Sequence, residues 1–290
     1  MERRPHHARS SRAWLVAAGI AALTAVGAAV LHSRTSETVD ETAFTGRGIA
    51  VRHLTLESTL VHRTMPVIGL VPAGAVRRPL LVFLHGRGGN ERSQLNESFA
   101  AALVSLGDRA PIVVFPYGGD HSYWHDRQSG DWAKYILDEV IPLAVTSLGA
   151  DRDRVAIGGI SMGGFGAYDL ARLNPGRFCA AYGSSPALWT RAGDTADGAF
   201  DNAADFARHD LIGTARSSAS RFGGLKLWMD SGTSDPFRQG QAALVAALRA
   251  GGVGIESTES PGGHDATYWH AHYRDGLAAA VAGCSAAAVP

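Results

Sequence analysis

Short apolar runs alternate with amphipathic stretches along the chain from about residue 50 onward. The runs at 79–84 (PLLVFL) and 111–115 (PIVVF) are continuously apolar, which is typical of strands buried on both faces. The stretch at 91–106 instead spaces its apolar residues with a helical period. Further strands are expected at 51–57, 64–71, 154–160, 178–182, 225–229 and 253–257, and further helices at 131–148, directly after Ser161, at 236–250 and at 267–282. This repetition predicts the α/β class, with a mostly parallel central sheet and helices on both faces.

Individual residues refine this outline. Asp131 is suited to cap the helix that follows it, and Gly149 is suited to end that helix. Pro142 lies inside the same stretch and predicts a kink or a break. The first two strands are expected to form an antiparallel start to the sheet. Residues 186–224 are less regular, and we expect an insertion or a lid over the site there.

The N-terminus has a different composition from the rest of the chain. Residues 1–12 carry four arginines and one acidic residue, and residues 13–31 run for 19 residues without a charge. As a helix this run would be about 28 Å long, close to the thickness of a bilayer core. A basic flank before an apolar run predicts a signal peptide or an N-terminal membrane anchor over 1–31, and both alternatives stay open. Either one places the rest of the protein outside the cytoplasm, secreted or held at the cell envelope.

The remaining composition is that of a globular protein. Polar residues 32–48 read as a linker, and 49–286 then form one domain of the 290-residue chain. The formal net charge is +0, so nothing points to a nucleic acid as partner. Cys179 and Cys284 are the two cysteines. Export would permit a disulfide between them, but the sequence leaves the pairing open.

The strongest chemical signal is the pentapeptide Gly159-Ile160-Ser161-Met162-Gly163, a G-x-S-x-G pattern. An apolar strand leads into it and a helical stretch leads out, which is the context of a nucleophile elbow. The turn presents the serine hydroxyl at the end of the strand, and the N–H of Met162 is directed toward the site. We therefore predict Ser161 as the nucleophile of an acyl-transfer reaction.

A serine hydroxyl needs a base, and the base needs an orienting acid. After an elbow the chain order is serine, acid, histidine. His264 is the one histidine on a Gly-rich loop after the last predicted strand, so it is the predicted base. Asp230 and Asp235 both follow the preceding strand, and we favour Asp235 as the acid. Asp230, at the strand end, is left as a turn residue or a substrate contact.

Two further loops follow buried strands and belong at the carboxyl edge of the sheet, where ligands bind. The loop that begins with His85 is rich in glycine and resembles the HGGG-type loop that donates a backbone N–H to the oxyanion. His85 itself is predicted to lie at the substrate. In the second loop, Tyr123 and Trp124 are expected either to line the substrate pocket or to pack the loop onto the domain.

Together these motifs resemble the esterase D and antigen 85 family of α/β-hydrolases over roughly 48–283. The shared marks are His85-Gly86, Ser122-Tyr123-Trp124, Gly159–Gly164, Asp235-Pro236-Phe237 and Gly263-His264-Asp265 with Tyr268-Trp269. The resemblance implies an α/β-hydrolase fold, Asp235 as the acid, and the backbone N–H groups of Arg87 and Met162 as oxyanion donors. The chain lacks the cysteine found in the corresponding loop of the formylglutathione hydrolases and is more similar to exported members.

The function expected from these residues is that of an exported serine carboxylesterase that works through an acyl-enzyme on Ser161. An alternative is an acyltransferase, similar to the mycolyltransferases, that moves an acyl chain to a sugar hydroxyl. An alternative of another class is a non-catalytic cell-wall binding protein on the same fold. The expected partners are small-molecule, lipid or carbohydrate esters, and the membrane if the N-terminal segment is retained. We expect no cofactor and no metal ion.

Overall fold

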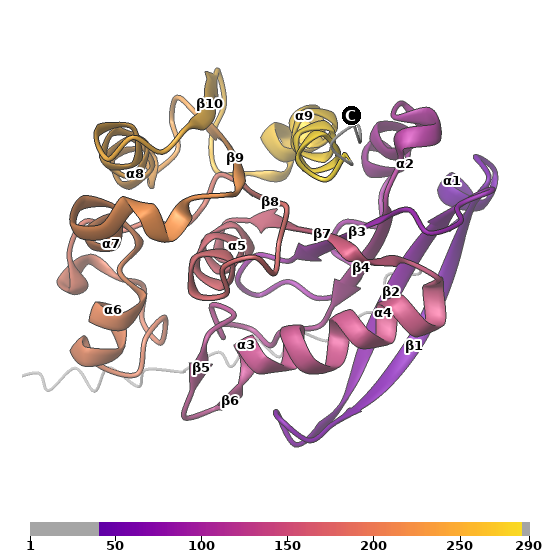
Figure 1. Cartoon of the computed structure of the whole chain (residues 1–290), viewed down its shortest axis with the longest axis horizontal. Helices are drawn as coiled ribbons and strands as arrows, with labels where there is room; N and C mark the ends of the chain where they lie inside the picture. The colour runs from indigo at the N-terminus through magenta and orange to yellow at the C-terminus, as the bar shows by residue number, and fades with distance from the viewer. Residues whose placement is uncertain (1–40, 286–290) are drawn as a thin grey trace, which may run out of the picture. The chain divides into compact units, whose positions relative to one another are not determined.

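The central sheet has eight strands in the order β1-β2-β4-β3-β7-β8-β9-β10 (Figure 1). The structure is a computed structural model and describes residues 41–285. β1 and β2 pair antiparallel at one edge, as predicted, and β2 pairs antiparallel with β4. From β4 to β10 all neighbouring strands are parallel. The strands are β1 (Ile49–Ser58), β2 (Arg63–Pro72), β3 (Pro79–Leu84), β4 (Ile112–Pro116), β7 (Asp151–Ile160), β8 (Ala180–Ser184), β9 (Lys226–Gly232) and β10 (Ile255–Ser260).

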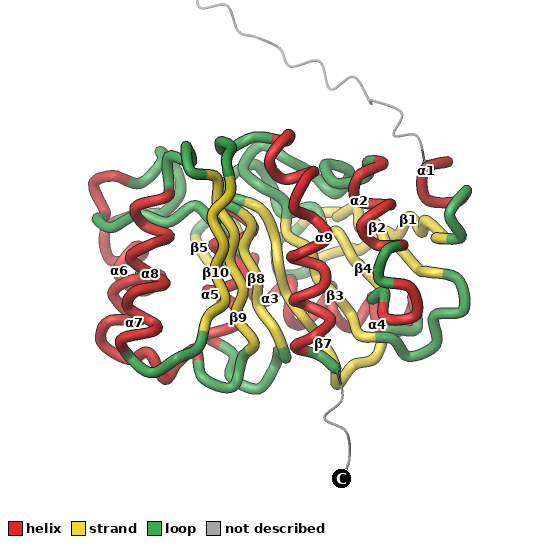
Figure 2. The backbone as a smooth tube through the Cα atoms, turned by 90° about the horizontal axis from the view of Figure 1, so that it is seen from above, coloured by secondary structure: helices red, strands yellow, loops and turns green. Residues whose placement is uncertain are grey.

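The apolar runs form strands because the sheet is covered on both faces. Alternate residues of β3 enter two separate hydrophobic clusters: Leu80 and Val82 belong to one, and Leu81 and Phe83 to the other. The helices α2 (Glu97–Val104) and α9 (Ala266–Gly283) cover one face, and α4 (Ile141–Leu148), α5 (Met162–Leu173) and α8 (Arg238–Ala250) cover the other (Figure 1, Figure 2). This confirms the predicted α/β class with helices on both faces.

The predicted helix at 131–148 forms as three consecutive segments. These are α3 (Trp132–Lys134), a π-helical segment (Tyr135–Val140) and α4. Pro142 lies at the start of α4, directly after the π-helical segment, so the break that it predicts takes the form of a change in helix type. Gly149 ends α4 in the left-handed region, as predicted. The capping role given to Asp131 was wrong, because Asp126 Oδ1 accepts the N–H groups at the start of α3 instead.

Two other segments differ from the outline that periodicity suggests. The stretch at 91–96 forms turns, and α2 begins only where the Asn96 side chain accepts the N–H of Phe99. The irregular stretch between β8 and β9 contains α6 (Ala203–His209) and α7 (Leu211–Ser218), flanked by short 3₁₀ turns. The remaining short elements are α1 (Thr42–Thr45), the 3₁₀ turns Gly107–Arg109, Ala192–Asp194 and Ala219–Phe222, and the two-residue strands β5 (Asp126–Arg127) and β6 (Gly130–Asp131).

The expected signal or anchor at 1–31 and most of the expected linker lie outside the described residues. The part of the linker that is described is folded: α1 buries the Phe44 side chain, and Arg47 pairs with Glu97 of α2 at 2.8 Å. Among residues 41–285, no helix is both long and apolar enough to cross a membrane.

Cys179 and Cys284 form a disulfide, which resolves the pairing left open by the sequence. Their Cα atoms lie 5.1 Å apart, and the bridge joins the start of β8 to the end of α9. The sulfur of Cys284 is buried within the cluster on the α9 face. The bridge therefore fixes the last helix to the middle of the sheet.

Replacing both Cys179 and Cys284 with serine is expected to lower the free energy of unfolding by about 2–4 kcal/mol, because the bridge closes a loop with a sequence separation of 105. Urea unfolding under non-reducing conditions measures this difference. Adding a reductant to the wild type should reproduce it, and a variant as stable as the oxidised wild type would contradict the prediction.

Candidate active site

Ser161 sits between β7 and α5 in a backbone conformation that L-residues rarely adopt, with φ 55° and ψ −115°. The turn is possible because two glycines let β3 approach it. A Cβ at Gly163 would lie 1.9 Å from the carbonyl oxygen of Leu84, and one at Gly159 would lie 2.3 Å from the same oxygen. The N–H of Ser161 donates to the carbonyl of Ser184 on β8 at 3.0 Å. Both neighbouring strands thus fix the turn predicted as a nucleophile elbow.

Ser161, His264 and Asp235 form a continuous chain of hydrogen bonds. Nε2 of His264 lies 2.8 Å from Oγ of Ser161, and Nδ1 lies 3.0 Å from Oδ2 of Asp235. Burial would raise the pKa of Asp235, but the hydrogen bonds from His264 and from the N–H of Phe237 outweigh it and keep that pKa below its ordinary value. The carboxylate is therefore ionised and can hold the His264 proton on Nδ1, which leaves Nε2 to accept the serine proton.

Two aromatic rings enclose the imidazole of His264. The ring centroid of Phe237 lies 5.0 Å from it and that of Trp269 lies 5.2 Å away, both roughly edge to face. Sequence reasoning missed Phe237 as a site residue, and Trp269 was named only among the shared marks of the resemblance. Their proximity in sequence to Asp235 and His264 was the available signal. The two rings restrict the orientation of the base by packing, in addition to its hydrogen bond with Asp235.

Met162 and the loop with Arg87 lie on either side of Ser161, where the oxyanion donors are expected. Met162 is the first residue of α5, so its N–H has no partner within the helix. On the other side Gly86 lies against Ser161, where an added Cβ would be 3.4 Å from the serine Cβ, and Arg87 follows directly. The guanidinium of Arg87 lies beside the hydroxyl of Tyr123. The loop after β3 is thus placed next to the nucleophile, as expected.

His85 does not line a pocket, which corrects the expectation that it binds substrate. It is 1% exposed, its Nδ1 bonds the carbonyl of Gly86 at 2.8 Å, and its Nε2 accepts the N–H of Gly118 at 2.9 Å. Burial lowers the pKa of His85 to about 4, so the ring is neutral near pH 7. It therefore joins the loop after β3 to the loop after β4 and shapes the backbone beside Ser161.

Tyr123 and Trp124 are also buried, so the packing alternative holds for both. The indole N–H of Trp124 donates to the carbonyl of His85 at 3.2 Å, and a Cβ at Gly118 would lie 2.2 Å from the Trp124 ring. The ring of Tyr123 lies against those of Phe165, Trp189 and Phe200. Tyr123 and Trp124 both have a positive φ, of 51° and 62° respectively. The rings fasten the loop after β4 onto the domain.

Asp230 belongs to β9 and is fully buried, so it is neither a turn residue nor a substrate contact. Burial raises its pKa to about 7, although the nearby hydroxyls of Ser184 and Tyr268 act in the opposite direction. Neither carboxyl oxygen has a partner in hydrogen-bond geometry. Asp235, five residues later and beyond the strand end, is the carboxylate that the fold presents to His264.

A mostly parallel sheet of this strand order, with a serine elbow after β7 and a histidine after β10, defines an α/β-hydrolase. Residues 58–280 match the model of the family described as "Putative esterase". The chain belongs to this esterase family, and the protein is a hydrolase. The resemblance to the esterase D and antigen 85 family is thereby confirmed.

Known relatives agree with this assignment. The chain is 26% identical to an acetyl esterase of Caldicellulosiruptor saccharolyticus over 211 residues, which are 66% of this chain and 78% of the relative. It is 24% identical to an esterase of Mycobacterium tuberculosis over 226 residues, 64% of this chain and 48% of the relative. The chain thus matches about half of that longer protein.

Solved structures share the fold at lower identity. A ferulic acid esterase superposes with a TM-score of 0.71 and 20% identity, over 82% of this chain and 99% of that one. MPT51 of Mycobacterium tuberculosis superposes with a TM-score of 0.62 and 18% identity, over 81% of this chain and 99% of that one. The α/β-hydrolase fold predicted from the sequence is therefore confirmed.

Asp235→Asn is expected to lower kcat by about 10⁴-fold, because an amide no longer holds the productive tautomer of His264. Asp230→Asn should leave kcat near the wild-type value, since its carboxyl reaches neither Ser161 nor His264. Hydrolysis of p-nitrophenyl acetate by the two variants measures the difference. An inactive Asp230→Asn beside an active Asp235→Asn would reverse the assignment of the acid.

Asp230 also predicts a dependence of stability on pH. Its native pKa of about 7 exceeds the ordinary 3.8, so the folded state holds a proton that the unfolded state releases. Its contribution to stability therefore falls as the pH rises from about 4 to about 7. Asp230→Asn has no carboxyl to ionise, so it should not lose stability in this way. The free energy of unfolding of the variant minus that of the wild type should therefore increase from pH 4 to pH 7, by at most about 4 kcal/mol.

Urea unfolding at pH 5 and at pH 8 tests this prediction. Asp108→Asn, which makes the same change at an exposed carboxyl, provides the matched control. A stability difference between Asp230→Asn and the wild type that is the same at both pH values would refute it.

Proposed function

We propose that this protein is a serine carboxylesterase that forms an acyl-enzyme on Ser161 and acts outside the cytoplasm. The observation that carries the proposal is the hydrogen-bonded series from Ser161 through His264 to Asp235. Such a series activates a hydroxyl that is otherwise a weak nucleophile. Membership in the esterase family supports an ester as the substrate.

Acylation follows from the geometry of the site. Oγ of Ser161 attacks the ester carbonyl while Nε2 of His264 takes its proton, and Asp235 stabilises the imidazolium that forms. The negative charge that develops on the carbonyl oxygen is placed near the N–H groups of Arg87 and Met162. The intermediate then collapses: the C–O bond to the alcohol breaks, His264 protonates the departing alkoxide, and the acyl group stays on Ser161.

Deacylation repeats these steps with water. His264 takes a proton from a water molecule, whose oxygen attacks the acyl carbonyl, and Ser161 leaves with the proton returned by Nε2. A sugar hydroxyl in the place of water would give acyl transfer by the same residues. The assembled triad argues against a purely non-catalytic binding role.

The proposal of export has two supports. Residues 1–31 combine a basic flank with an uncharged apolar run, which is the composition of a signal or anchor. The Cys179–Cys284 disulfide is typical of proteins in oxidising compartments. Fractionation of cells that produce the full-length chain, followed by immunoblotting, tests the location, and a protein found only in the cytoplasm would contradict it.

Ser161→Ala is expected to lower turnover of p-nitrophenyl esters by about 10⁴-fold or more and to abolish covalent labelling by a fluorophosphonate, because both need the Oγ nucleophile. A series of acyl chain lengths, with and without trehalose, separates hydrolysis from transfer. Transfer would appear as an acylated sugar in the product analysis. Wild-type protein that neither hydrolyses these esters nor takes up the label would overturn the proposal.

A further inference from the structure

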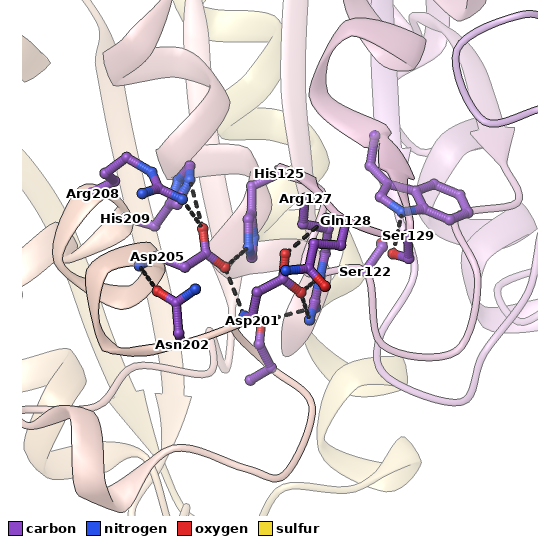
Figure 3. Close-up of polar contacts among 12 residues, drawn as sticks. Ser122, His125, Arg127, Gln128, Ser129, Asp201, Asn202, Asp205, Arg208 and His209 are labelled. Atoms are coloured by element: carbon purple, nitrogen blue, oxygen red, sulfur yellow. Dashed lines mark hydrogen bonds and ion pairs between the residues drawn. The ribbon is translucent and has the colours of Figure 1, made fainter.

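A second cluster of titratable side chains lies apart from the hydrogen bonds of the triad. It comprises His125, from the loop after β4, and Asp205 and His209, which lie one turn apart on α6 (Figure 3). One candidate ligand atom from each residue lies within 4.8 Å of the others, and all three residues are buried. The imidazole centroids of His125 and His209 are 4.2 Å apart. Nothing in the proposed esterase mechanism uses these groups.

His209 is oriented as a histidine ligand is in known metal sites. Its Nδ1 lies 2.6 Å from Oδ2 of Asp169, and the other oxygen of Asp169 is 2.6 Å from Arg172. A carboxylate on one ring nitrogen fixes the proton there and leaves the lone pair on the other. Nε2 of His209 therefore presents its lone pair toward Asp205, whose Oδ1 is 3.7 Å away.

Only one of the two ring nitrogens of His125 has a hydrogen-bond partner. Its Nε2 lies 3.1 Å from Oδ2 of Asp205, while its Nδ1 is buried and has no partner. The side chain is 0% exposed, so water does not reach it from the surface.

We propose that His125, Asp205 and His209 bind a divalent transition-metal cation, with zinc the first candidate. Two imidazoles and one carboxylate are a common ligand set for such ions, with a further position left for water. Nitrogen and oxygen ligands at about 2.0–2.1 Å from a tetrahedral zinc are roughly 3.4 Å apart. Two spacings in the cluster lie on either side of this value: 3.1 Å between Nε2 of His125 and Oδ2 of Asp205, and 3.7 Å between Nε2 of His209 and Oδ1 of Asp205.

The main competitor of the cation is Arg208. Its guanidinium lies 2.8 Å from Oδ1 of Asp205, but its side chain is 62% exposed and can turn into solvent. Arg208 and His209 both line an open pocket of about 540 Å³, which Arg172 and Arg221 also line, so the His209 side of the cluster borders solvent. Metal binding would therefore replace Arg208 at the Asp205 carboxylate without unfolding α6.

The site would join two segments that frame the active site. His125 follows Trp124, which packs against the His85 loop, and Asp205 belongs to the insertion between β8 and β9. Around the cluster, Arg127 already pairs with Asp201 at 2.8 Å (Figure 3). A cation there would hold the insertion against the loop after β4, a stabilising role that does not depend on the esterase proposal.

The test uses full-length protein without an affinity tag of histidines, stripped with a chelator and dialysed. Zinc is then added, and metal content and thermal unfolding are measured. We expect about one zinc ion per chain and a rise in Tm of about 5–10 °C at a hundredfold excess over Kd. Cobalt bound in the same place should give the visible absorption of a tetrahedral site.

Three substitutions locate the site. His209→Gln and Asp205→Asn should abolish the zinc-dependent rise in Tm, while the surface control His53→Gln should retain it. Arg208→Gln distinguishes a metal site from a cluster that is held together only by ion pairs and hydrogen bonds. If the cluster binds zinc, this variant should have a lower Kd for zinc because a competing cation is gone. If Arg208 and Asp205 only form a stabilising ion pair, the variant should be less stable both with and without zinc.

The proposal is overturned if the wild type takes up no stoichiometric zinc or shows no rise in Tm. It is equally overturned if His209→Gln responds to zinc as the wild type does, or if Arg208→Gln binds zinc no more tightly. Should His209→Gln fail to fold, the affinity of Arg208→Gln for zinc still decides the question.

Discussion

The close approach of β3 to the turn at Ser161 is the constraint on which the site depends. Gly159 and Gly163 have no Cβ, so the carbonyl of Leu84 can lie where any other side chain would collide with it. The same approach gives Ser161 its strained backbone and places Gly86 beside its side chain. The contact between the end of β3 and the turn after β7 thus fixes the conformation of Ser161 and places the loop after β3 beside it.

The sheet was predictable because burial on both faces leaves a continuous apolar run in the sequence. The run at 79–84 became β3 with the same bounds, and the parallel strands from β4 to β10 then all end on one edge. Chain order and loop position therefore favoured Ser161, Asp235 and His264, which the structure brings together. Helix starts were less predictable, since the competition between Asp126 and Asp131 is decided by tertiary contacts.

The residues expected at the substrate were the ones that sequence reasoning misplaced. His85 and Asp230 follow or end strands at the correct edge, but both are buried and face the protein interior, and for Trp124 the packing alternative holds. The position of a residue along a strand predicts the edge of the sheet at which it lies, but it does not predict how deeply its side chain is buried. The partner that fixes Trp124 is the backbone of His85, and no local pattern reveals such a pairing.

The disulfide divides the catalytic residues in an unexpected way. Ser161 precedes Cys179, whereas Asp235 and His264 lie between Cys179 and Cys284 and so inside the covalent ring. A single protease cut in the insertion between β8 and β9 would therefore not release either half, because the fragment with the nucleophile remains bonded to the fragment with the base. The molecule can be nicked at its most irregular segment and still carry a complete set of reacting groups on one covalent assembly.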